Sequence, residues 1–103
     1  MLFLSTVDYI SFGKQMTEKQ VKIVNRLGLH VRPATAFAQI AGKYKSNILV
    51  IKDGQTINAK SSIELLTLAA IEGTVLTIKA DGDDAEEAAN ALVKLVESKF
   101  GEE

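Results

Sequence analysis

Asp53 and Gly54 form a dipeptide that limits the possible folds of this chain more than any other local feature. Residues 48–52 and 55–59 flank it and contain isoleucine, valine and threonine, which are typical of strands. An Asp-Gly pair readily adopts the positive φ angles of a two-residue hairpin turn. The sequence therefore predicts a pair of neighbouring antiparallel strands at this point in the chain.

Amphipathic helical segments lie on both sides of the hairpin. Apolar residues recur at spacings of three and four, the period of one buried helical face, at Ala34, Phe37, Ile40, Ala41 and Tyr44. A second stripe comprises Ala88, Leu92, Leu95 and Val96. Asp83 or Asp84 would cap this last helix in a capping box with Glu86 or Glu87, and Gly101 would end it.

The predicted elements are a strand at 20–25, a helix at 31–44, strands at 48–52 and 55–59, a helix at 61–67, a strand at 74–80 and a helix at 84–99. Their order is βαββαβα, which predicts an α+β fold. A four-stranded antiparallel sheet would be covered on one face by the three helices.

Length and composition indicate one small globular domain. The chain has 103 residues, 47% hydrophobic and 24% charged, and a net charge of -1 that gives no reason to expect nucleic acid as a partner. No apolar run approaches the roughly 20 residues that span a bilayer, so no membrane insertion is expected. The absence of cysteine is compatible with the cytoplasm. Residues 1–15 form an N-terminal extension of uncertain order, and residues 16–103 form the domain.

Residues 28–34, Gly-Leu-His-Val-Arg-Pro-Ala, predict an anion site at the start of a helix. Pro33 lacks a backbone N–H and suits the first helical turn, which places His30 at or just before the N-cap. Unpaired N–H groups, the helix dipole, the His30 ring and the Arg32 guanidinium could then bind one phosphate together.

His30 is the only histidine, and an isolated histidine is more often a surface or core residue than a nucleophile. Its neighbours favour a functional role, because Gly28 suits a loop that approaches a phosphate and Arg32 supplies a positive charge that can bind one. With no cysteine and no second histidine, the sequence predicts neither a metal site nor a cofactor.

Ser61 begins the short segment 61–67, and its pattern with Glu64 predicts a capping box. In this arrangement the serine hydroxyl accepts a backbone N–H bond and Glu64 reaches back to the N–H of Ser61. The residue therefore has a structural role irrespective of any modification.

The chain resembles HPr, the histidine-containing phosphocarrier of the bacterial phosphoenolpyruvate-dependent sugar phosphotransferase system. The resemblance rests on residues 28–34, on Asn-Ala-Lys-Ser-Ser-Ile at 58–63 and on Leu-Thr-Leu-Ala-Ala at 66–70. It implies the open-faced β-sandwich of that family. It also implies that His30 accepts a phosphoryl group on Nδ1 from phosphorylated enzyme I and passes it to enzyme IIA domains, while Arg32 stabilises the phosphate.

The same resemblance implies further roles for the segment that follows Ser61. Ser61 matches a serine that HPr kinase/phosphorylase modifies in many bacteria, and Glu64 departs from the glycine or basic residue of many relatives. Ser62, Ile63 and Leu66 match residues that dock on partner proteins. Core packing is the structural alternative for Ile63 and Leu66.

Two alternatives to a sugar phosphotransferase carrier stay open. One is a carrier of a nitrogen-related or regulatory phosphotransferase branch, which would use the same chemistry at His30. The other is a non-catalytic regulatory binding module, although purely regulatory relatives lack this histidine. We expect a monomer that meets its partners transiently and is a relay component rather than an autonomous enzyme.

Overall fold

The computed structural model describes residues 16–102, and the N-terminal extension predicted at 1–15 lies outside the described residues. The elements are β1 (Met16–Lys22), α1 (Val31–Ala41), β2 (Asn47–Lys52), β3 (Gln55–Asn58), α2 (Ser62–Thr67), β4 (Val75–Asp81), α3 (Ala85–Glu97) and the 3-10 turn η1 (Lys99–Gly101). The predicted order βαββαβα is confirmed.

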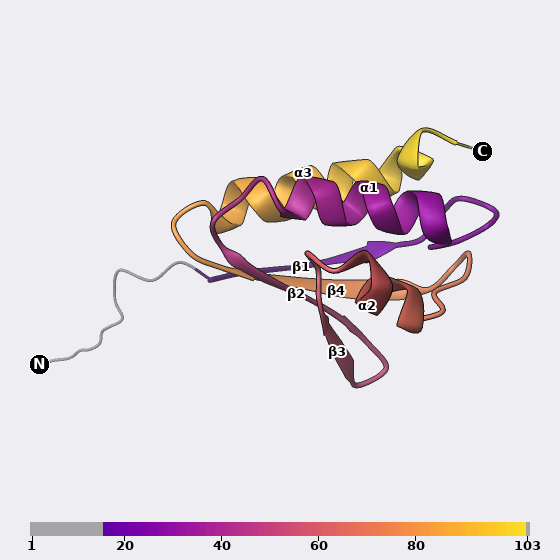
Figure 1. The fold of residues 1–103 in the computed structure, drawn as a ribbon, viewed down its shortest axis with the longest axis horizontal. Helices are drawn as coiled ribbons and strands as arrows, with labels where there is room; N and C mark the ends of the chain where they lie inside the picture. The colour runs from indigo at the N-terminus through magenta and orange to yellow at the C-terminus, as the bar shows by residue number, and fades with distance from the viewer. Residues whose placement is uncertain (1–15, 103) are drawn as a thin grey trace, which may run out of the picture.

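The four strands form one antiparallel sheet in the order β1-β4-β2-β3. Helices α1 and α3 lie side by side across one face of this sheet (Figure 1), while α2 contacts α1 and β3. The predicted α+β open-faced sandwich is therefore confirmed. Within residues 16–102, no helix is both long and apolar enough to cross a membrane.

The core lies between the sheet and the helices, where the two periodicities meet. Alternate residues of β4, Leu76, Ile78 and Ala80, are buried, as the period of two in a strand requires. The facing helical residues of α3 are Ala85, Ala88, Ala89, Leu92 and Val96. Burying one large aliphatic side chain contributes about 1.5–3 kcal/mol. This core fixes the sheet and α1, and α1 in turn fixes the position of His30.

The hairpin predicted at Asp53 and Gly54 is confirmed. Both residues have positive φ angles, 49° and 82°, between the paired strands β2 and β3. The mirror-image turn of these φ values matches the twist of the flanking strands. The turn therefore aligns Lys52 with Gln55 as the last pair of the ladder.

Several element boundaries differ from the prediction. Strand β1 starts and ends earlier than 20–25, because the pairing with β4 begins at Met16 opposite Asp81. Helix α1 ends at Ala41 rather than at 44, with Gly42 as its C-cap. Helix α3 ends at Glu97, before the predicted 99.

The capping box predicted for α3 is wrong. Asp84 is the N-cap of α3 but caps nothing with its side chain. Its carboxylate instead accepts hydrogen bonds from the backbone N–H groups of Lys45 and Ser46 and from the Ser46 hydroxyl. These bonds, above all the one from the Ser46 hydroxyl, lower the pKa of Asp84. Asp84 therefore joins α3 to the turn before β2 instead of closing its own helix.

Candidate functional site

His30 is the N-cap residue of α1, as predicted. Its backbone is extended, and its carbonyl accepts the first helical bond, from the N–H of Ala34 at 2.9 Å. Pro33 lies in the first turn, where a missing N–H costs nothing. Within the described part of the chain, the N–H groups of Val31 and Arg32 have no hydrogen-bond partner. The start of α1 therefore offers two free donors beside the imidazole.

The loop before His30 is held against the segment that follows α2. Gly28 has a φ of +69°, and a Cβ atom there would lie 2.5 Å from the carbonyl oxygen of Ala70. The next residue, Leu29, donates its N–H to that same oxygen at 2.9 Å. Glycine is required because both the φ angle and the close approach exclude a side chain. This contact fixes the position of the loop that leads into His30.

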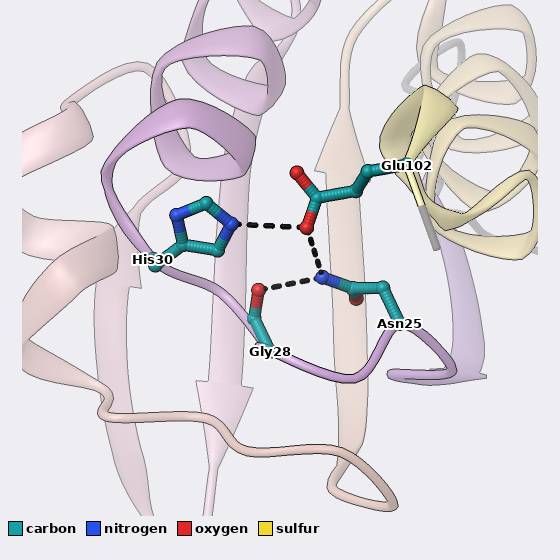
Figure 2. Close-up of polar contacts among 4 residues, drawn as sticks. All are labelled: Asn25, Gly28, His30 and Glu102. Atoms are coloured by element: carbon teal, nitrogen blue, oxygen red, sulfur yellow. Dashed lines mark hydrogen bonds and ion pairs between the residues drawn. The ribbon is translucent and has the colours of Figure 1, made fainter.

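A network of polar side chains holds the imidazole in place (Figure 2). His30 Nε2 lies 2.9 Å from Glu102 Oε1, and the same carboxylate oxygen accepts a hydrogen bond of 3.0 Å from Asn25 Nδ2. Asn25 Nδ2 also donates to the carbonyl oxygen of Gly28 at 2.8 Å. The network thus joins the loop before α1 to the segment after η1.

The electrostatic environment of Glu102 keeps its carboxyl group ionised. The hydrogen bond from His30 has the largest effect in lowering the pKa of Glu102; the bond from Asn25 and the charges of His30 and Arg32 lower it further. The Glu102 side chain is 15% exposed and the His30 side chain 34% exposed. The ring is therefore accessible at one edge and anchored at the other.

Sequence reasoning missed both Asn25 and Glu102. Asn25 ends the strand predicted at 20–25, but in the structure it is fully buried in the loop after β1. Glu102 follows the predicted helix end, and no local pattern pairs it with a histidine far earlier in the chain. The signal that the sequence offers is an asparagine three residues before Gly28, a residue type that often bonds backbone groups in turns.

The surface around His30 is hollowed into a pocket of about 320 Å³, lined by Arg26, Leu27, His30, Arg32 and Glu102. Arg32 is exposed, and its guanidinium forms no hydrogen bond with other residues of 16–102, which leaves it available to a ligand. A larger hollow of about 470 Å³ lies over the strands, lined by residues such as Asn47 and Lys79. We assign the chemistry to the smaller pocket because it contains the imidazole and both arginines.

Ser61 is the N-cap of α2, and its hydroxyl accepts a hydrogen bond from Glu64 N at 3.2 Å. This half of the predicted capping box is confirmed. The other half is wrong, because Glu64 Oε1 accepts from Asn58 N at 2.9 Å, while Ser61 N donates to the carbonyl of Asn58. The glutamate therefore fastens α2 to the end of β3.

The predicted docking residues lie in α2 with different exposures. Ile63 is 75% exposed and Leu66 is 36% exposed, whereas Ser62 is half-buried. Core packing, the structural alternative, therefore does not account for Ile63. Residues 16–102 contain no cluster of three or more histidine, cysteine or acidic side chains arranged to bind a metal ion.

Comparisons with known proteins agree on one family. A family model described as "PTS HPr component phosphorylation site" matches residues 17–98. The phosphocarrier protein HPr of Neisseria meningitidis serogroup A is 41% identical over 87 residues, which make up 84% of this chain and 98% of that protein. The HPr-like protein Crh of Halalkalibacterium halodurans is 40% identical over 84 residues, 82% of this chain and 100% of Crh.

A solved structure of the same family also matches the fold of this chain. The crystal structure of HPr-C-His from Thermoanaerobacter tengcongensis superimposes with a TM-score of 0.81 at 49% identity. The match covers 84% of this chain and 98% of that one. The resemblance inferred from residues 28–34 and 58–70 is thereby confirmed.

Proposed function

Because the chain belongs to the HPr phosphocarrier family of the phosphotransferase system, we propose that His30 accepts a phosphoryl group on Nδ1 from phosphorylated enzyme I. The group then passes to enzyme IIA domains that serve sugar uptake. The observation that supports this most is the shared pocket, in which the accessible His30 ring lies beside Arg32 at an uncapped helix start.

The chemistry asks the protein mainly for positioning and charge stabilisation. The Nδ1 lone pair forms the new bond to phosphorus as the bond to the donor breaks. The transferred group adds negative charge at the pocket, where Arg32 and the free N–H groups of Val31 and Arg32 can bind it. The site is open, so the next acceptor can approach the same phosphorus.

Partner docking is proposed for a surface on α2. This surface comprises the exposed side chains of Ile63 and Leu66 and the half-buried Ser62. Leu27 and Val31, 73% and 65% exposed, extend the apolar character to the rim of the site. The contact between helices α1 and α2 supports a docking surface that spans both elements. A monomer acting in the cytoplasm suits such brief contacts, since transient relay interfaces are small.

Ser61 is proposed as a second, regulatory phosphorylation site for HPr kinase/phosphorylase. The hydroxyl is partly accessible, although it already accepts the bond from Glu64 N. A phosphate there would replace this cap and add negative charge near the docking surface. We expect the fold to persist and docking to weaken.

A nitrogen-related or regulatory branch is the second candidate function; its regulatory form is favoured by the similarity to Crh, described as the Bacillus subtilis catabolite repression HPr, at 38% identity. His30 distinguishes the possibilities, because a purely regulatory module has no need of the nucleophile. Transfer from phosphorylated protein to a sugar-specific enzyme IIA or to a nitrogen-related one would separate the two carrier branches.

The deciding experiment incubates the protein with phosphoenolpyruvate, magnesium and enzyme I and measures its intact mass. We expect one phosphoryl adduct that is lost in acid and absent from His30→Ala. A cognate enzyme I that produces no adduct on the unmodified chain would overturn the proposal. For Ser61, an acid-stable adduct formed by HPr kinase and ATP, and absent from Ser61→Ala, is the corresponding result.

A further inference from the structure

The hydrogen bond between His30 and Glu102 determines which ring nitrogen bears the hydrogen. An ionised carboxylate can only accept hydrogen bonds, and the pKa of Glu102 is lowered by its contact with His30. The 2.9 Å distance from Nε2 to Oε1 therefore requires Nε2 to be the donor. In a neutral imidazole with hydrogen on Nε2, Nδ1 keeps its lone pair.

Nδ1 lies on the opposite side of the ring from this contact. Figure 2 shows it pointing away from Glu102. Within residues 16–102 no group donates to or accepts from it. Nδ1 is thus the nitrogen without hydrogen in this tautomer, and it is also the one that forms no hydrogen bond with these residues.

Asn25 holds the Glu102 carboxylate in place, and this carboxylate in turn orients the His30 ring. Its side chain is fully buried, and its amide nitrogen donates both to Gly28 O and to Glu102 Oε1. Surface pairs in this protein are looser, such as Lys19 and Glu86 at 3.6 Å, and long exposed side chains hold such contacts weakly. The Glu102 carboxylate is instead held by two donors from a part of the chain far away in sequence.

The backbone after α3 is shaped to bring Glu102 to this position. Lys99, Phe100 and Gly101 have φ angles of +61°, +55° and +76° in succession. Left-handed backbone is unfavourable for lysine and phenylalanine and persists only where surrounding contacts enforce it. Phe100 packs against the core, and Glu102 forms its bonds immediately afterwards.

We propose that Glu102 is a positioning residue for His30, holding hydrogen on Nε2 so that Nδ1 presents its lone pair to phosphorus. This inference rests on the proposed function. As the Nδ1–phosphorus bond forms, the bond from phosphorus to the donor's leaving atom breaks and its electron pair stays with the donor. The ring becomes positively charged, keeps its Nε2 hydrogen and faces the Glu102 carboxylate, which stabilises that charge.

The test compares Glu102→Ala with Glu97→Ala, a control that removes an exposed carboxylate from α3. Nitrogen-15 NMR of the His30 ring measures the tautomer in the unphosphorylated protein, with the ring neutral. We expect the Nδ1–H tautomer to rise about tenfold in Glu102→Ala, as loss of a bond to a charged group implies. Single-turnover transfer from phosphorylated enzyme I should slow about tenfold. Glu97→Ala should match the wild type in both measurements.

An unchanged tautomer ratio in Glu102→Ala would overturn the inference, as would a changed ratio with an unchanged transfer rate. The NMR measurement needs no partner protein. If the wild-type chain takes no phosphoryl group from enzyme I, the proposed function fails, and the tautomer ratio still decides whether Glu102 sets the state of the ring. Thermal unfolding of both variants identifies any loss of rate that comes from a misfolded domain.

Discussion

The first turns of α1 and α2 differ in whether a side chain bonds their free backbone N–H groups. Each helix begins with backbone N–H groups that have no partner inside the helix. In α2, Ser61 accepts one of these bonds and Glu64 supplies an acidic group in the first turn. In α1, His30 occupies the same N-cap position without capping, and the first turn contains no acidic residue.

The difference separates a structural helix start from one that is available to a ligand. A capping side chain is worth about 1 kcal/mol, so α1 forgoes that stability and keeps its donors free. The first turn of α1 itself also contributes no negative charge to the positive end of the helix dipole, which lies beside Arg32. An incoming phosphoryl group finds the N–H groups of Val31 and Arg32 unbonded at α1, whereas at Ser61 it must displace a bond already made.

Installing a cap at α1 is the strongest way to break this contrast. In His30→Ser the hydroxyl can accept from Arg32 N, the only donor in reach because Pro33 has none. We expect complete loss of the acid-labile adduct in intact-mass analysis, with thermal stability close to that of the wild type. An acid-labile adduct that persists would mean that the phosphoryl group resides elsewhere.

The open start of α1 depends on Gly28, which presses the loop against the segment after α2. Gly28→Ala should lower the free energy of unfolding by about 2–3 kcal/mol, because it combines backbone strain with a steric clash. Urea denaturation measures this. The matched control is Gly54→Ala, which has φ +82° but nothing within 4 Å of its Cβ. Equal losses in the two variants would show that the close approach to Ala70 is unimportant.

Arg32 supplies the charge that the first turn of α2 lacks. We expect Arg32→Ala to slow phosphoryl transfer about tenfold, a moderate effect because the guanidinium is exposed. Stopped-flow or quenched transfer from phosphorylated enzyme I provides the rate. Arg26→Ala, which removes the other arginine of the pocket but lies outside the helix, should have a smaller effect. The reverse ranking would contradict the role of the helix start.

Removing the cap of α2 should affect stability alone. Ser61→Ala is expected to cost about 1 kcal/mol in urea unfolding and to leave transfer through His30 within a factor of about two. Ser61→Asp should keep the cap, since aspartate is also a good N-cap, while weakening enzyme I docking through its charge. Slow transfer in Ser61→Ala would connect the two helix starts functionally.

Acidification should have the smallest of these effects, a loss of stability at the Glu102 contact beside α1 and no change at the Ser61 cap of α2. The folded-state pKa of Glu102 lies below its ordinary value of 4.5, so its bonds stabilise the folded protein above that pH. This stability is lost as the pH falls through the lowered folded-state pKa. The stability difference between wild type and Glu102→Gln should therefore shrink between pH 5 and pH 3. The difference for Ser61→Ala should stay constant, because the serine hydroxyl does not titrate there.

Local patterns in the sequence predicted what depends on neighbouring residues. The turn at Asp53 and Gly54, the N-cap position of His30 and the cap by Ser61 each rest on the geometry of a few adjacent residues. The two motifs around His30 and Ser61 also identified the family. Such features can be predicted without knowing any tertiary contact.

The failures concern side chains whose partners lie outside their own helix. Asp84 and Glu64 have the right residue type and spacing for local capping, but tertiary partners, Ser46 and Asn58, compete for their carboxylates. The contact between Glu102 and His30 depends on three successive positive φ angles that no propensity would suggest. Polar side chains near element ends have several acceptable partners, and only the assembled fold selects among them.

Strand β1 has a consequence for how the chain is made. Among residues 16–102 its only partner in the sheet is β4, and the pairing of Met16 with Asp81 joins residues near opposite ends of this range. During synthesis, β1 leaves the ribosome long before β4, the strand with which it pairs. Non-local pairings of this kind slow folding and leave edges exposed in the meantime. The β1–β4 ladder can therefore close only after translation has passed β4, and the contact that anchors the His30 ring must wait for Glu102, later still.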